Sequence, residues 1–382
     1  MRENGIKQKN VAHFNNKLVA NLLLDEPLSC IELSKKTKLT HVATGIIVDR
    51  LLNMDLIRFH REEPPKKRSQ GGQHVRYEIN PKRAYYICIS FQYGRESFSV
   101  YDLAKNCVYS ESFADDMVDE AVFDGVIKRI KKVLVDRKIS DDSVAVVSVA
   151  IPGRMDTESG EIIVSTRIDK ALNLKEKLKK AFPFSVTEVK NDIDYACLGS
   201  ILSEEFDYGN GTHFYLYVGW KGMACCIISD KKIICGANGF CGEVGMNYVD
   251  KERGRLSEMI PVEHIMNDCR KILNDSSADL NEIVKRSYLN ADIRNKFIEN
   301  AEFFGAFISN YTDVLGCTHI VFAGPITAYP DYYFEFFKRN MIDPEYGAMM
   351  NYKVDISTVD ATNIGQMLMS RLQALDWVME KY

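Results

Sequence analysis

Apolar residues in the first part of the chain recur with a helical period. In the stretch NVAHFNNKLVANLLLDEP they fall on one side of a predicted helix, which Pro27 ends, at Val11, Phe14, Leu18 and Leu22. Ser29 and Glu32 then have the spacing of a capping box, in which each side chain accepts a hydrogen bond from the backbone N–H of the other residue. The sequence therefore predicts a long helix followed by a second, short one.

After a turn at Lys36 to Leu39, a third predicted helix runs from Thr40, its capping residue, to about Asn53. Its apolar positions recur at steps of three and four and should face a core: Ala43, Ile47, Leu51 and Met54. The opposite side carries Thr40, His41, Gly45 and Arg50. A helical hairpin with a merely solvated polar side has the same pattern, so these helices alone do not decide the function.

The next segment alternates between apolar and polar residues at 57–60 and again at 75–79, which predicts two short strands. The loop between them is rich in Pro, Gly and basic residues, among them Arg61, Lys66, Lys67 and Arg68. Two helices joined by a turn and followed by a basic hairpin predict a winged helix-turn-helix, whose second helix enters a DNA major groove while the wing lies along phosphates. A flexible linker would explain the Pro and Gly residues but not the two strands.

From residue 84 the pattern changes to a mixture of strands and helices. Three strands precede a helical stretch at 120–137, and the apolar run VAVVSVAIPG predicts a buried strand. Another strand and helix follow, and then the hairpin HFYLYVGWKGMACCIISDKKII begins a second set. This repeated order favours an α/β fold with two lobes of the RNase H or actin type.

Charge is divided unevenly along the chain. Residues 1–83 hold 16 Lys and Arg against 9 Asp and Glu, a balance of +7, whereas the other 299 residues hold 33 against 44, a balance of −11. A basic domain joined to an acidic one suits a protein of which only the first part contacts phosphates.

Other features of the sequence indicate where the protein is located and whether it holds a metal. The first residues, MRENGIKQKN, do not resemble a signal peptide and no apolar run is long enough to cross a membrane, so we expect a cytoplasmic protein without a membrane partner. Ten cysteines are present, but their spacing fits no zinc module, so we expect buried thiols rather than a metal site or disulfides.

Four motifs resemble the ROK family of sugar kinases and repressors, in the order and spacing of that family: VAIPGRMD (149–156), VKNDIDYACLG (189–199), GANGFCGEVG (236–245) and VFAGPI (321–326). The segment LTHVATGIIVDRLLNMDLI also resembles the helix-turn-helix of the family's repressor branch. The resemblance implies a DNA-binding domain at 1–83, a first lobe at 84–200 completed by a C-terminal helix at 363–382, and a second lobe at 201–362. It further implies that the lobes close on a sugar, which would be held by Pro152, Gly153, Asn191, Asp192 and Glu243.

Two turns that hold metal and phosphate in the family's kinases differ in this chain. The resemblance aligns an Asp-x-Gly-Gly-Thr turn with residues 90–94, which read SFQYG, and a Gly-Thr-Gly turn with residues 219–222, which read GWKG. Phosphoryl transfer rests on positioning and charge stabilisation, so we expect no enzyme, no catalytic residue and no cofactor, although Asp192, the family's general base, is present. An ATP-dependent hexose or acetylhexosamine kinase is the alternative.

The family usually has a zinc-binding His after Gly-Glu-x-Gly, followed by three cysteines. Here that position is Met246, and the following VDKERGRLSE has no cysteine, so no zinc is expected. Arg255 is expected to pair locally with Glu243 or Glu258. Whether Glu258 replaces the family's last sugar-contacting Glu stays open.

These features favour a DNA-binding transcriptional regulator of ROK type, a repressor by default, that binds a double-stranded operator as a homodimer or homotetramer. Three hypotheses follow. The regulator responds to a neutral carbohydrate, it is a repressor that has lost its effector, or the chain is a kinase.

Overall fold

The structure of the chain is a computed structural model. It describes residues 8–60, 75–92, 95–114, 117–156, 159–165, 167–236, 241–341, 352–357 and 361–381. The chain divides into two compact units, of which unit 1 comprises residues 1–155, 160–190 and 366–382 and unit 2 comprises residues 156–159 and 191–365. Helix α12 (Ala361–Glu380) contributes its first five residues to unit 2 and the others to unit 1.

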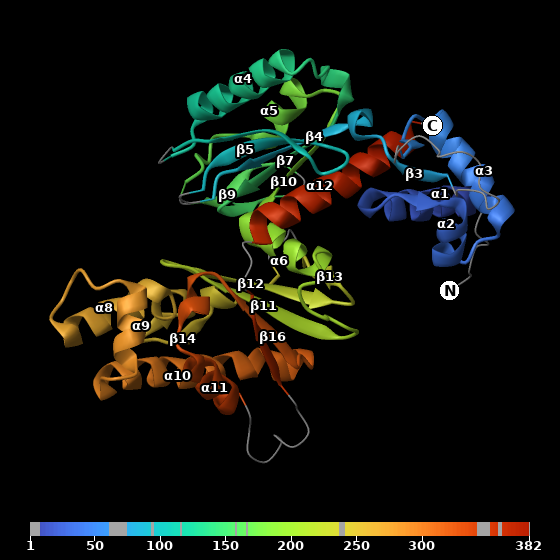
Figure 1. Cartoon of the computed structure of the whole chain (residues 1–382). Helices are drawn as coiled ribbons and strands as arrows, with labels where there is room; N and C mark the ends of the chain where they lie inside the picture. The colour runs from blue at the N-terminus through green and yellow to red at the C-terminus, as the bar shows by residue number, and fades with distance from the viewer. Residues whose placement is uncertain are drawn as a thin grey trace. The chain divides into compact units, whose positions relative to one another are not determined.

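Unit 1 begins with a small winged domain, which has three helices and a three-stranded sheet in the order β1-β3-β2 (Figure 1). Its elements are α1 (Gln8–Asp25), β1 (Leu28–Ser29), α2 (Cys30–Thr37), α3 (His41–Asn53), β2 (Ile57–Phe59) and β3 (Arg76–Ile79). The predicted capping box opens α2, since the N–H of Ser29 donates to Glu32 at 2.8 Å and the N–H of Glu32 donates to Ser29 at 3.3 Å. Both predicted strands are confirmed, and the arrangement is the predicted winged helix-turn-helix.

The core side of α3 agrees with the prediction and that of α1 does not. Ile47, Leu51 and Met54 are buried as expected, while Ala43 is only partly covered. The buried residues of α1 are Asn16, Val19, Ala20, Leu23 and Leu24, whereas the predicted Val11 and Phe14 are 44% and 65% exposed. Helix α1 is apolar on more than one side, and the elements that pack on it decide which side is covered.

The rest of unit 1 is built on a five-stranded sheet in the order β10-β7-β4-β5-β6. Its strands are β4 (Tyr85–Ser90), β5 (Ser97–Asp102), β6 (Cys107–Ser112), β7 (Val144–Ile151) and β10 (Val186–Asn191). Helices α4 (Glu120–Asp136) and α5 (Leu174–Ala181) cover one face and α12 covers the other (Figure 1). A hairpin of β8 (Gly153–Met155) and β9 (Ile162–Ser165) follows β7, whose apolar run is buried throughout as predicted.

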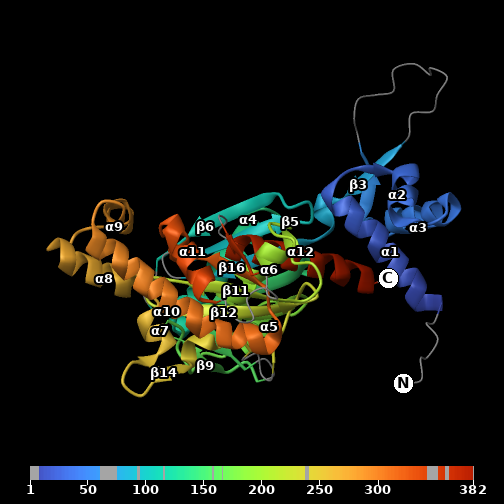
Figure 2. The same ribbon diagram turned by 90° about the horizontal axis from the view of Figure 1, so that it is seen from below.

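One hydrophobic core joins the winged domain to this sheet and to α12. It includes Leu23 and Leu24 of α1, Ile79 of β3, Tyr86 of β4, and Leu375 and Val378 of α12. The turned view shows the C-terminal end of α12 beside α1 (Figure 2), where Lys17 pairs with Asp376 at 2.6 Å. The winged domain is therefore packed onto the first sheet and is not held by its linker alone.

Arg371 of α12 is the polar centre of this junction. Its guanidinium is 2% exposed and donates to the carbonyl of Leu103 at 2.8 Å, to the carbonyl of Leu24 at the end of α1, and to Asp25 at 3.3 Å. A cation at the C-terminus of a helix also interacts favourably with the helix dipole. One buried side chain thus ties α1, the β5–β6 turn and α12 together.

Unit 2 repeats the strand order of the first sheet. Counted along the chain, each sheet has its third, second, first, fourth and fifth strands side by side, as the repeated pattern of the sequence predicts. The strands are β11 (Thr212–Val218), β12 (Met223–Ser229), β13 (Lys232–Ile233), β16 (His319–Ala323) and β17 (Lys353–Ile356). The other elements are α6 (Asp192–Leu202), β14 (Tyr248–Asp250), β15 (Gly254–Arg255), α7 (Leu256–Met259), α8 (Val262–Leu273), α9 (Leu280–Ser287), α10 (Ala291–Leu315) and α11 (Asp331–Asn340).

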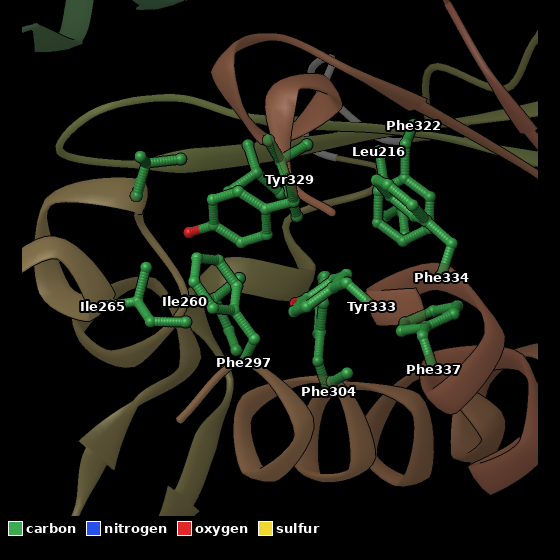
Figure 3. Packing of buried hydrophobic residues seen from close by; sticks show 14 of the residues in the cluster. Leu216, Ile260, Ile265, Phe297, Phe304, Phe322, Tyr329, Tyr333, Phe334 and Phe337 are labelled. Atoms are coloured by element: carbon green, nitrogen blue, oxygen red, sulfur yellow. The ribbon is translucent and has the colours of Figure 1, made fainter. Parts of the chain in front are cut away.

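The two faces of this second sheet are covered differently. Helix α6 packs on one face against Tyr215 and Cys226. On the other face lies a large aromatic core (Figure 3), in which rings from α10, α11 and β16 meet, among them Phe304, Phe337 and Phe322. The ring centroids of Phe322 and Phe337 are 4.9 Å apart in an edge-to-face contact. This core holds β11, β12 and their loops in place.

We expect Arg371→Met to lower the free energy of unfolding of unit 1 by about 3 kcal/mol, because two buried carbonyls lose a charged donor. Lys17→Met is the matched control, since the Lys17–Asp376 pair is more than a third exposed on both sides and worth at most about 1 kcal/mol. Urea unfolding in a Trp220→Phe background measures both, with Trp377 of α12 as the remaining tryptophan. Equal losses in the two variants would contradict the role assigned to Arg371.

Candidate functional site

The outer side of α3 presents part of the predicted DNA-contacting set. Thr40 and His41 are exposed, and Thr40 also caps the helix by accepting from the N–H of Ala43 at 3.2 Å. At Gly45 no atom would lie within 4 Å of an added Cβ, so the backbone there is open to a partner. Arg50 is exposed, but its guanidinium lies 3.4 Å from Asn16 of α1 and braces the two helices.

Several basic residues surround this helix. The predicted wing residues Arg61, Lys66, Lys67 and Arg68 lie outside the described residues. Among the described residues, Lys35, Lys36 and Lys38 are exposed at the turn between α2 and α3. Lys36 forms an ion pair with Glu26 at 2.6 Å. Positively charged side chains therefore lie just before the N-terminal end of α3.

Two further residues on the same outer side, Val42 and Ile46, were not among the predicted DNA contacts. Val42 is 72% exposed and Ile46 is 57% exposed, although both are apolar and branched. They lie four residues apart and each follows a residue of the predicted outer side, His41 or Gly45. The helical period of the sequence would therefore have placed them on this side. Their exposure marks the middle of this side as apolar.

Asn191 and Asp192 stand at the start of α6 in unit 2. Asn191 caps the helix, and its side chain accepts from the N–H of Ile193 at 2.9 Å. The carboxylate of Asp192 is 8% exposed and lies 3.0 Å from the same N–H. A carboxylate is stabilised at a helix N-terminus by the helix dipole, so both residues also serve the fold.

Glu243 lies in a turn whose preceding position, Gly242, can be occupied only by glycine. Gly242 before it has φ +88°, and an added Cβ would lie 2.1 Å from the carbonyl oxygen of Cys225 on β12. Glu243 itself is half-buried and opens a short 3-10 helix, Val244–Met246. The sequence motif thus fixes the backbone of this turn against β12 of unit 2.

Strand β12 brings the two acidic segments to neighbouring positions. The thiol of Cys226 lies 3.8 Å from the carbonyl oxygen of Ile193 and 3.5 Å from the carboxylate of Asp194 at the start of α6. The adjacent Cys225 is the residue against which Gly242 packs. Pro152 and Gly153 are in unit 1, where Ser165 donates to the Pro152 carbonyl at 2.7 Å.

Arg255 and Glu258 hold the loop after Met246. The carboxylate of Glu258 accepts from the N–H of Arg255 at 3.1 Å and so caps α7. The guanidinium of Arg255 lies 3.5 Å from the sulfur of Met246 and 5.2 Å from the ring centre of Tyr248. These contacts give the thioether of Met246, which is 50% exposed, a place in a small surface cluster.

The thiols near this loop do not form a metal site in the described part of the chain, where no group of three His, Cys, Asp or Glu could hold an ion. Burial raises the pKa of the Cys225 thiol well above its ordinary value. A hydrogen bond with Cys197 and burial do the same to the pKa of Cys226. Both thiols are therefore protonated near neutral pH.

The two turns that align with kinase phosphate turns have other uses here. Phe91 is fully buried, with its ring 5.9 Å from that of Phe113, and Ser90 and Gln92 beside it are also buried. In the second turn, the N–H of Gly219 donates to the carbonyl of Gly222 at 2.8 Å. Among the described residues of these turns, the N–H groups of Phe91 and Gly219 both donate to backbone carbonyls and so are not free to hold a phosphate.

The ROK family model matches residues 87–367, which is most of the chain. The chain belongs to the ROK family. It is similar to a solved ROK family transcriptional regulator, a homolog of the E. coli MLC protein, with 18% identity, 97% of this chain and 99% of that chain covered, and a TM-score of 0.75. A search of the curated proteins found no match.

ROK sugar kinases are similar to part of the chain. A ROK hexokinase from Thermus thermophilus has 14% identity, with 76% of this chain and 99% of that chain covered and a TM-score of 0.60. A ROK glucokinase from Streptomyces griseus, solved with glucose and AMPPNP, has 15% identity, 75% and 99% covered and a TM-score of 0.58. At such identities the likeness shows the ROK fold, which agrees with the predicted fold class.

None of the helices in the described part of the chain combines the length and the hydropathy needed to span a bilayer.

We expect Gly242→Ala to lower the free energy of unfolding of unit 2 by more than about 2 kcal/mol, because its Cβ would meet the Cys225 carbonyl. Gly209→Ala is the matched control, since Gly209 also has positive φ, +42°, but no atom within 4 Å of an added Cβ. That control should cost about 1 kcal/mol. Urea unfolding followed through Trp220 in a Trp377→Phe background measures both. Similar losses would show that the turn can move away from β12.

Proposed function

We propose that this ROK family protein is a DNA-binding transcriptional regulator, a repressor by default, in which α3 enters the major groove of an operator. The observation that carries the proposal is the winged helix-turn-helix, whose α3 leaves its outer side exposed while its other side packs in a core. Helix-turn-helix proteins read DNA with the helix in this position. The winged domain is also the part of the chain with a net positive charge, +7 over residues 1–83.

The comparison with relatives supports the same proposal. The similar ROK regulator covers 97% of this chain, whereas the similar hexokinase covers 76%. The family model begins at residue 87, so the residues before it are additional to the part that kinases and regulators share.

Kinase activity is disfavoured by the residues at the two phosphate turns. Buried Ser90 and Gln92 stand in place of the first turn's Asp and first Gly, and the N–H of Gly219 in the second turn already has a backbone acceptor. Catalysis of phosphoryl transfer rests on such positioned groups, so a ROK fold without them has a binding site and no means of transfer. We therefore propose a sensor that is not an enzyme.

The proposed effector is a neutral carbohydrate held by Asn191, Asp192 and Glu243 of unit 2. Carboxylates accept hydrogen bonds from sugar hydroxyls, and two of them repel an anionic ligand such as a sugar acid. The similar Streptomyces griseus enzyme was solved with glucose, which makes hexoses the first compounds to test.

We further propose that the regulator works as a homodimer or homotetramer in the cytoplasm. Two copies of a helix-turn-helix bind two half-sites, so the operator should be a pseudo-palindrome with half-sites about one or two turns of DNA apart.

We expect Lys38→Asn to weaken binding to all duplexes by a similar factor and to reduce the slope of log K against log salt by about 1, because one phosphate contact is lost. Lys231→Asn is the control, since both lysines are exposed and have positive φ, 60° and 61°. Asn tolerates that backbone conformation, so strain is matched. Fluorescence anisotropy on duplexes selected from a random library, at several salt concentrations, measures both variants. Failure of the full chain to enrich any sequence would contradict the proposed function.

We expect a neutral sugar to raise the thermal midpoint of the wild-type protein and to weaken its binding to the selected operator, because effector and DNA share one conformational equilibrium. Glu243→Gln should weaken the affinity of the protein for the sugar by about tenfold or more, since a charged hydrogen bond contributes about 1.5 to 3 kcal/mol. Glu252→Gln, an exposed residue beyond the same loop, should leave sugar affinity unchanged.

A broad panel of mono-, di- and amino-sugars should be tested in this assay. A flat thermal response with intact operator binding would favour a regulator that has lost its effector. ATP-dependent phosphorylation of a bound sugar, above that of an Asp192→Asn control, would assign the protein to the kinases instead.

A further inference from the structure

The outer side of α3 has an unusual composition for a surface. Between His41 and Asp49 it presents Val42, Gly45 and Ile46, while Ile47 and its neighbours on the other side form the core. Val42 is 72% exposed and Ile46 is 57% exposed. Branched apolar residues lower helix propensity and gain nothing from contact with water, so neither the helix nor the core requires them at these positions.

These residues limit how the helix can read DNA. Direct readout of guanine or adenine uses long side chains with paired donors or acceptors, such as Arg, Asn or Gln. None of the three central positions of this side has one, and the nearest such side chain, that of Arg50, lies against Asn16. The only apolar group that the major groove offers is the 5-methyl group of thymine.

We infer that Val42 and Ile46 read the 5-methyl groups of thymines in each half-site, which makes the preferred operator rich in A·T pairs at its centre of contact. The inference rests on the proposed function and names the bases that α3 recognises. Gly45 fits it, because the space above this residue lets the helix backbone approach the base edges closely.

The spacing of the two side chains sets the pattern. Four residues of an α-helix advance about 6 Å along its axis, and successive base pairs are about 3.4 Å apart. For a helix that lies along the groove, the two thymines are about two base steps apart. The exposed Lys35 and Lys38 before the helix supply the charge that draws this apolar side to DNA.

The experiment uses the full chain and a duplex selected from a random library. Each thymine of one half-site is replaced in turn by deoxyuridine, which removes the 5-methyl group and leaves every hydrogen-bonding group in place. We expect two replacements to weaken binding by about three- to fourfold each, the effect of removing one buried methyl group. Val42→Ala and Ile46→Ala should each abolish the response at one of these two thymines, because the partner of that methyl is gone.

Val135→Ala is the matched control. Val135 is 76% exposed on α4, so its truncation removes equally exposed apolar surface and should leave both responses unchanged. Any effect of deoxyuridine on the shape of the duplex would persist in the α3 variants, which separates it from a lost contact.

Each outcome has one meaning. Binding that is equal on thymine and deoxyuridine duplexes would overturn the inference while leaving DNA binding intact. A response that survives in both α3 variants would assign the methyl groups to other residues and overturn it as well. Absence of binding to any duplex would remove the proposed function and the inference with it.

Discussion

The position of the winged domain depends on one buried cation. Arg371 reaches from α12 to the carbonyl that ends α1 and to the turn between β5 and β6, and it is 2% exposed. A guanidinium in such a place is tolerated only where its donors find acceptors, so its position fixes three elements at once. The apolar core around it, from Leu24 to Val378, then excludes water from the same junction. The helix that we propose to read DNA is thereby held by the sheet as well as by its own small domain.

Helix α12 also has a second close contact at its other end. An added Cβ at Gly365 would lie 1.8 Å from the carbonyl oxygen of Tyr195, and one at Gly199 would lie 2.2 Å from the carbonyl oxygen of Ala361. The backbones of α6 and α12 therefore touch without side chains between them, and a shift of α6 must be followed by α12. Asn191 and Asp192 start α6, so the proposed ligand would lie on a helix that packs against the first turn of α12. This contiguous packing gives the coupling between effector and operator, which we propose, a physical basis.

Local features of the structure followed from the sequence, and long-range ones did not. The capping box at Ser29, the cap at Thr40 and the strands of the wing were predicted because each depends on residues a few positions apart. The buried side of α1 was predicted wrongly, because an apolar period says that a helix has a core side but not which neighbour covers it. The role of Arg371 could not be predicted, since its partner Leu24 is 347 positions away. Glu243 and Asp192 are placed on segments that both meet β12, but ligand binding itself stays a prediction.

The residues of the candidate ligand site do not carry equal weight. Asn191 and Asp192 both accept from the N–H of Ile193, so the start of α6 explains their presence without any ligand. Glu243 is positioned differently, because Gly242 before it has φ +88° and packs against the carbonyl of Cys225 on β12. Substitution of Asn191 or Asp192 therefore removes a cap from α6 as well as any contact with the proposed ligand, so a loss of ligand response in those variants must be compared with the stability of the helix.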